Sequence, residues 1–138
     1  MLRMRFLPSD FDPVLLVLGT REELRRFAGL LTTFARWGRP VSLAEEGGFS
    51  PDTRVRLTAP GSAEAGRPGL WRDGGQEGLL LWTLDRGQAV RFAGEIADLA
   101  DGASRAGSAI LDPPSLNGIA VKVSLGEFED DFLLGGAW

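Results

Sequence analysis

Two stretches of equal length decide the fold: VLLVLGTREELRRFAGLLTTFA at residues 14–35 and LLLWTLDRGQAVRFAGEIADLA at residues 79–100. Each opens with an apolar run, which is typical of a strand that is covered on both faces or lies well inside a sheet. Each then continues with apolar residues at helical spacing. The two stretches therefore predict two strand–helix units, and the rest of the chain is interpreted around them.

A capping box begins each predicted helix. Thr20 is followed three residues later by Glu23, and Asp85 is followed in the same way by Gln88. In such a box the first side chain accepts a hydrogen bond from the backbone N–H of the third helical residue, whose own side chain bonds back to the first residue's N–H. Both helices are therefore expected to begin directly after the capping residue.

The apolar residues of each predicted helix lie on one face. At helical spacing they form a continuous stripe that faces the core: Leu24, Phe27, Ala28, Leu31, Phe34 and Ala35 in the first helix, and Ala89, Phe92, Ala93, Ile96, Leu99 and Ala100 in the second. The first helix should end at Gly38, and the second should span about residues 86–101. Gly29 and Gly94 stand in mid-helix, where glycine costs about 1 kcal/mol relative to alanine. We interpret both as sites of close approach to the sheet.

The two stretches also match each other at an offset of 65 residues, so that Arg26–Gly29 (RFAG) aligns with Arg91–Gly94 (RFAG). We interpret the match as an internal duplication of units 14–59 and 79–125, with the small-residue loop 60–69 between them. The alternative is that any two strand–helix units in a chain rich in arginine and alanine resemble each other.

Shorter apolar runs complete the expected elements. Strands are predicted at Met1–Phe6, Val41–Ala44, Arg54–Ala59, Leu70–Arg72, Ala106–Leu111 and Ile119–Leu125, several of them from strict alternation, and Asn117-Gly118 is a hairpin signal. Each half then has the order strand, helix, strand, strand. We expect one α+β domain over residues 1–138, with a single, mainly antiparallel sheet of about six strands and both helices on one face.

The composition excludes most of the residue types that enzymes use for catalysis. The 138 residues include no His, Cys or Tyr, so the usual general base near neutral pH, every thiolate nucleophile and the Ser-His-Asp and Cys-His constellations are excluded. The glycine-rich segments match no phosphate-binding motif. Carboxylate pairs occur at Asp10 and Asp12 and at Glu45 and Glu46, but adjacent acids in turns are usually only hydrated. We expect no enzyme, no cofactor and no metal site.

Charge and hydropathy limit the classes of partner that the protein is expected to bind. Fifteen basic and 19 acidic residues give a net charge of −4, the wrong sign for a protein that binds nucleic acid by neutralising phosphates. No stretch approaches the apolar length of a membrane span, and the first 12 residues lack the pattern of a secretory signal. A cytoplasmic protein that binds neither nucleic acid nor membrane is expected.

Two segments are candidates for binding a partner protein. The first combines acids and an aromatic residue in the run Glu127, Phe128, Glu129, Asp130 and Asp131, and the second is Trp71 with Arg72 beside a glycine-rich turn. Clustered acids increase the attraction of a basic partner, and exposed Trp and Arg are common anchors of interfaces. The alternatives are a solvated acidic tail, a divalent-cation site without calcium-loop spacing, and aromatic residues that pack on the core.

In layout the chain resembles small bacterial immunity proteins that neutralise polymorphic toxins. The resemblance is carried by Gly19-Thr20-Arg21-Glu22-Glu23-Leu24 with its helix and by the final strand that runs into Glu127-Phe128-Glu129-Asp130-Asp131-Phe132. It implies a non-enzymatic domain that occludes a protein partner, a basic toxin. The alternative is a domain that binds a small ligand or associates with itself, for instance as a homodimer through an exposed sheet edge.

Overall fold

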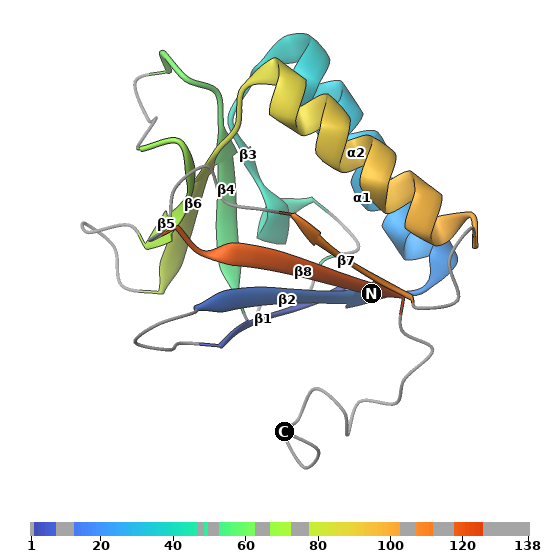
Figure 1. Ribbon diagram of the computed structural model, residues 1–138. Helices are drawn as coiled ribbons and strands as arrows, with labels where there is room; N and C mark the ends of the chain where they lie inside the picture. Colours follow the sequence, from blue (N-terminus) through green and yellow to red (C-terminus); the bar gives the residue numbers. More distant parts are fainter. Residues whose placement is uncertain are drawn as a thin grey trace.

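The computed structural model describes residues 2–7, 13–46, 49, 53–62, 67–72, 78–102, 107–111 and 118–125. Within these ranges the chain forms two helices and eight strands in two four-stranded sheets (Figure 1). The predicted α+β class is therefore confirmed. The hairpin signal at Asn117 lies partly outside the described residues, as do residues 63–66 of the loop between the two halves.

The elements follow each other in the same order in both halves. The first half contains strand β1 (Arg3–Leu7), strand β2 (Val14–Gly19), helix α1 (Arg21–Trp37), strand β3 (Val41–Ser42), the short 3₁₀ helix η1 (Leu43–Glu45) and strand β4 (Arg54–Thr58). The second half contains strand β5 (Gly69–Arg72), strand β6 (Leu79–Thr83), helix α2 (Arg86–Ala100), strand β7 (Ser108–Leu111) and strand β8 (Ala120–Leu125).

The prediction of one sheet is wrong. One sheet has the strand order β1-β2-β8-β7 and the other the order β3-β4-β6-β5. In each sheet the two central strands are parallel, β2 with β8 and β4 with β6, and the outer strands pair antiparallel to them. The sequence could indicate adjacent hairpins, but a parallel pairing between distant strands leaves no local pattern to read.

Each sheet is built from both halves of the chain. The β1–β2 hairpin joins β8 and β7 from the second half, and the β5–β6 hairpin joins β4 and β3 from the first. At the offset of 65 residues the registers of the two parallel pairs differ by one position: Leu18 lies opposite Ser124, whereas its counterpart Thr83 lies opposite Thr58, the counterpart of Val123. The two threonine hydroxyls are buried and 2.9 Å apart. The halves therefore interlock, while the duplication of their sequence stays a prediction.

Both capping boxes are present as predicted. The Thr20 N–H donates to Glu23 Oε1 at 2.9 Å, and the Glu23 N–H donates to Thr20 Oγ1 at 3.2 Å. The Asp85 N–H donates to Gln88 Oε1 at 3.1 Å, and the Gln88 N–H donates to Asp85 Oδ1 at 2.7 Å. The helix begins directly after each cap because these bonds satisfy backbone donors that have no partner in the first turn.

The two helices lie side by side over the sheets (Figure 1), with the start of α1 at the end of α2. The Arg21 guanidinium donates to the Ala100 carbonyl at 3.1 Å, and Arg25 lies 3.3 Å from the Asp101 carboxylate. Cations at a helix C-terminus satisfy its last carbonyls and complement its dipole. Neither α1 nor α2, the helices of the described ranges, has the length and apolar character of a membrane span.

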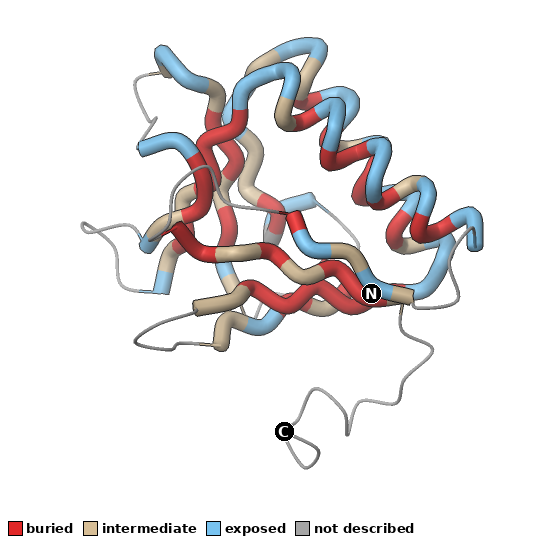
Figure 2. Tube along the Cα trace, viewed as in Figure 1, coloured by how far each residue is buried: buried red, intermediate tan, exposed pale blue. Residues whose placement is uncertain are grey.

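One hydrophobic core joins the helices to both sheets, and Figure 2 shows the buried side of each helix facing the strands. Both predicted apolar stripes are buried apart from Ala35, which is half-buried. Trp82 stands at the centre: its ring lies 6.5 Å from that of Phe27 and 6.1 Å from that of Phe92. Aromatic rings at such distances contribute beyond their buried area.

Two further expectations need correction. Gly29 and Gly94 are exposed, and a Cβ built on either would meet no atom within 4 Å, so close approach to a sheet does not explain them. The strand expected at residues 41–44 stops at Ser42, because the chain turns into η1 as Leu43 enters the core. Strand β7 begins at residue 108 rather than 106, after Gly107 in the left-handed region (φ 68°).

We expect Gly29→Ala and Gly94→Ala each to stabilise the protein by about 0.5–1 kcal/mol. Each adds a methyl group in open space and reduces the conformational freedom of the unfolded chain. Denaturant unfolding followed by circular dichroism measures the change. The control is Gly19→Ala, whose Cβ would collide with the buried Leu2 side chain; it should destabilise by about 1–3 kcal/mol. Loss of stability in the helix variants would contradict this account.

We also expect that neither half of the chain folds as a monomer. Fragments 1–66 and 67–138 each lack two strands of both sheets, so each alone should give the circular dichroism spectrum of an unfolded chain. Mixing them should restore the native spectrum, because each supplies the parallel partner of the other's central strand. A single fragment that folds as a monomer would contradict the interlocked arrangement.

Candidate functional site

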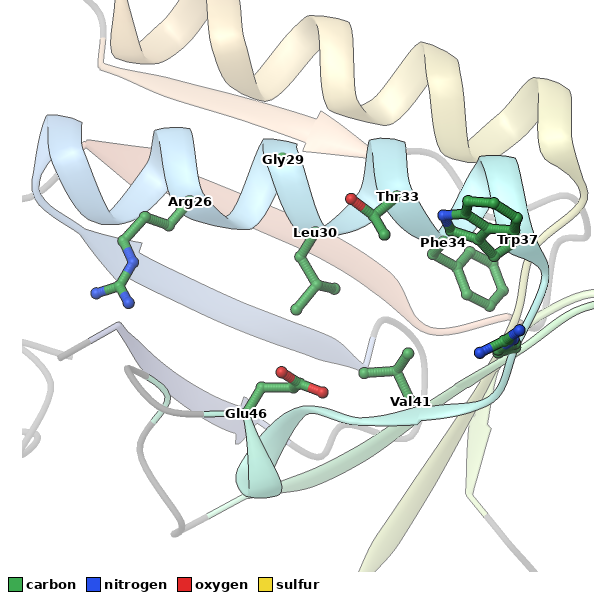
Figure 3. Close-up of a pocket in the computed structure, with 9 residues that line it drawn as sticks. Arg26, Gly29, Leu30, Thr33, Phe34, Trp37, Val41 and Glu46 are labelled. Carbon is green, nitrogen blue, oxygen red and sulfur yellow. The ribbon is translucent and has the colours of Figure 1, made fainter.

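A groove runs along α1, between the helix and the segment formed by β3 and η1 (Figure 3). Its volume is about 590 Å³. The helix contributes most of the lining and the following segment contributes the rest: Arg26, Gly29, Leu30, Thr33, Phe34, Trp37, Arg39, Val41 and Glu46. Most of these residues lie on a flank of α1 that the core leaves uncovered.

The helix side of the groove follows from residue spacing. Arg26, Leu30, Thr33 and Trp37 recur every three or four residues and therefore lie above one another along α1. Counted around the helix, Trp37 lies about 120° from the centre of the buried stripe. Its side chain is 62% exposed, although tryptophan is one of the largest apolar residues.

The groove carries charge at its ends and apolar surface between them. Figure 3 shows Arg26 and Trp37 at opposite ends, with Leu30 and Val41 facing each other in the middle and Glu46 on the far side from the helix. The Arg39 guanidinium lies 5.9 Å from the centroid of the Trp37 ring, within range of a cation–π contact.

The lining residues offer charged groups and apolar contacts to a ligand. Two guanidinium groups against one carboxylate favour an anionic group on the ligand, which arginine binds in a bidentate manner. The apolar middle favours an aliphatic or aromatic group beside it. In the described ranges no three His, Cys, Asp or Glu side chains gather where they could hold a metal ion.

The sequence singled out Trp71 and Arg72, and they lie on the outer strand β5, apart from the groove. Trp71 is half-buried; its indole N–H donates to the Pro68 carbonyl at 3.0 Å, and the Arg67 guanidinium covers its ring at 3.8 Å. Arg72 is exposed and lies 4.8 Å from the centroid of the Phe6 ring. The two neighbours thus make separate contacts, and their role in partner binding stays a prediction.

The acidic run falls outside the described part of the chain: Glu127, Phe128, Glu129, Asp130 and Asp131 are not among the described residues. Asp10 and Asp12, the first candidate carboxylate pair, also lie outside it. Of the second pair, Glu46 lines the groove, and Glu45 is exposed beside it.

The groove itself was missed in the sequence. Trp37 stands at the end of the first helix, and its angular position off the apolar stripe was a usable signal. Arg39 and Val41 follow the Gly38 cap, and nothing in their local pattern says that the chain turns back along the helix. Comparison of the chain with models of protein families, with curated proteins and with solved structures found no match.

We expect Trp37→Ala to change the free energy of unfolding by less than about 1 kcal/mol, because the side chain is mostly exposed. The matched control is Trp82→Ala, which empties the centre of the core and should cost about 3–5 kcal/mol. Denaturant titration of both variants measures the difference. A cost for Trp37→Ala close to that of Trp82→Ala would mean that the ring is structural.

Proposed function

We propose that this protein is a non-enzymatic binding domain that takes an extended segment of a partner protein into the groove along α1. The observation that carries the proposal is the exposure of Trp37, 62% open to solvent at one end of a groove of about 590 Å³. Tryptophan and arginine are enriched among the residues that dominate binding energy at protein interfaces.

The dimensions support a peptide segment as the occupant. Arg26 and Trp37 are separated by three turns of α1, about 16 Å at 1.5 Å per residue. An extended chain rises about 3.3 Å per residue, so about five residues would match this length. The groove is formed by a helix and the segment next to it, and a site that is formed before binding lowers the entropic cost of binding.

The charges support an acidic and apolar segment. The Arg26 and Arg39 guanidinium groups outnumber the single Glu46 carboxylate among the lining residues. A carboxylate of the partner would bind one of these guanidinium groups, and an aliphatic or aromatic side chain would cover Leu30 and Trp37.

The composition supports binding rather than catalysis, because the chain has no His, Cys or Tyr. A domain that occludes a basic toxin, as in the immunity proteins that the layout resembles, is a narrower form of this proposal. In that form the acidic residues Glu127, Glu129, Asp130 and Asp131 would also contact the partner.

The volume of the groove also supports a second candidate, a small-molecule binding domain, because pockets for such ligands measure about 300–1,000 Å³. Mass spectrometry of the protein under native conditions separates the two candidates. A co-purified compound of defined mass that Trp37→Ala releases would favour the small ligand over the peptide.

The test of the proposed function is selection from a random peptide library displayed on phage against the full chain. The selected peptides should share an acidic residue next to an aromatic or large aliphatic residue. Trp37→Ala and Arg39→Glu should each weaken the best peptide at least about tenfold, which is about 1.4 kcal/mol.

The matched control is Val90→Ala, because Val90 is a large apolar residue that is 53% exposed on the other helix. This variant should bind the same peptide with an unchanged dissociation constant. Peptides whose affinity is insensitive to both groove variants would show that the groove is not the binding site.

A further inference from the structure

A second surface lies on the sheet formed by β1, β2, β8 and β7, on the face turned away from the helices. Alternation along β2 sends Leu15 and Val17 into the core and Leu16 and Leu18 to this outer face. Leu16 and Leu18 form a hydrophobic cluster of their own, separate from the core. We name the outer face around these two leucines the leucine face.

The leucine face is more deeply buried than its strand neighbours explain. Leu16 is 2% exposed and Leu18 is 3% exposed, and burial is continuous from Leu15 to Gly19 (Figure 2). Both described helices pack on the opposite side of the sheet (Figure 1). A sheet face without a covering layer is normally exposed to water. The burial of these two leucines therefore requires a further group that covers them.

The other sheet supplies an internal comparison. Leu81 occupies on β6 the place that Leu16 occupies on β2, and it is flanked by the large residues Trp71 and Arg56. Leu81 is nevertheless only half-buried. Leu16 is flanked by Arg5 and Lys122. Since strand neighbours leave Leu81 partly open, they do not account for the complete burial of Leu16.

Cationic residues surround the two leucines. The register of the sheet places Arg3 beside Leu18, and Arg5 and Lys122 on either side of Leu16. Lys122 is the only lysine of the chain. The leucine face therefore combines an apolar centre with three positive charges, and a matching segment would carry aromatic or aliphatic residues among acids.

We propose that residues 126–138, GEFEDDFLLGGAW, bind the leucine face of their own domain. The sequence of this segment has the required chemistry, with four acids between Glu127 and Asp131 and with Phe128, Phe132, Leu133 and Leu134 as apolar groups. Its acids would face Arg3, Arg5 and Lys122, and its phenylalanines would cover Leu16 and Leu18.

The position of the segment in the chain supports this occupant. Strand β8 ends at Leu125, which pairs with Gly19, next to Leu18. Thirteen residues follow, about 40 Å of extended chain, whereas a four-stranded sheet is about 15 Å wide. The loop between β1 and β2 leaves the sheet at the opposite end, next to Val14, and Val14 is less buried than Leu16 and Leu18.

The proposed contact affects the partner-binding role that the sequence predicts for the acidic residues 127–131. Residues 127–131 would be held by Arg3, Arg5 and Lys122, so a basic partner would have to displace them from the leucine face. Salt would release the segment, because it screens the attraction between the charges. The proposal does not depend on the groove along α1.

The chain lacks cysteine, so a single introduced thiol reports its surroundings. Ser124 lies on the leucine face beside Leu18 and is 8% exposed; Ser108 lies opposite Ser124 on the outer strand β7 and is exposed. In the full chain at low salt, Ser124→Cys should react with a maleimide at least about tenfold more slowly than Ser108→Cys. Circular dichroism checks that both variants are folded.

Two changes should abolish the difference in reaction rate between the two introduced thiols. Neutralising the segment (Glu127→Gln, Glu129→Gln, Asp130→Asn and Asp131→Asn) or raising NaCl to about 1 M should bring the two rates within about threefold. Neutralising Glu22, Glu95 and Asp98, which are exposed acids on the helices, should leave the protection intact. Trp37→Ala should also leave it intact, which separates this proposal from the groove.

A charge exchange gives a second readout if Ser124→Cys does not fold. Reversing Arg3 and Arg5 to Glu should lower stability, and reversing the four segment acids to Lys in the same chain should restore it. Protection or stability that is insensitive to every change in residues 126–138 would overturn the proposal. Protection that is lost on dilution of the protein would also overturn it, because a second copy would then be the cover.

Discussion

The rest of the structure depends on the two parallel strand pairs, because each pair joins a strand of one half of the chain to a strand of the other half. Val14 pairs with Ala120 at one end of the β2–β8 ladder, and Arg54 pairs with Leu79 at one end of the β4–β6 ladder. The outer strands only extend these pairs. Both helices then pack on one core. This core is complete only when both parallel strand pairs have formed. This core contains residues of both halves.

The parts of the fold that short-range physics determines were predictable. The Thr20–Glu23 and Asp85–Gln88 boxes are chemical patterns three residues long, and the structure contains the bonds that they predict. The apolar stripes were readable because helical periodicity is fixed by geometry. The parallel ladders were not readable, since β2 and β8 join residues more than 100 positions apart, β4 and β6 join residues 25 positions apart, and neither pairing leaves a local pattern.

The same distinction between local and long-range features applies to the candidate sites. The groove brings Trp37 together with Val41 and Glu46, and the turn after Gly38 that makes this possible has no signature of its own beyond the cap. The leucine face could be recognised only when the register placed Arg5 and Lys122 on either side of Leu16. In the sequence the run VLLVL indicated a strand that is covered on both faces or lies well inside a sheet. Both faces of β2 are buried, but the sequence did not say what covers the second face.

The interlocked strand order has a consequence for synthesis on the ribosome. β2 is the second of the described strands to be made, and its parallel partner β8 is the last of them. Until then the apolar strand Val14–Gly19 has β1 on one edge and an unpaired ladder on the other, and unpaired strand edges are prone to aggregation. The nascent chain therefore lacks the β2–β8 pair until β8 has been made, and this sheet can close only after β8 has left the exit tunnel. Long-range pairings of this kind also slow folding after release.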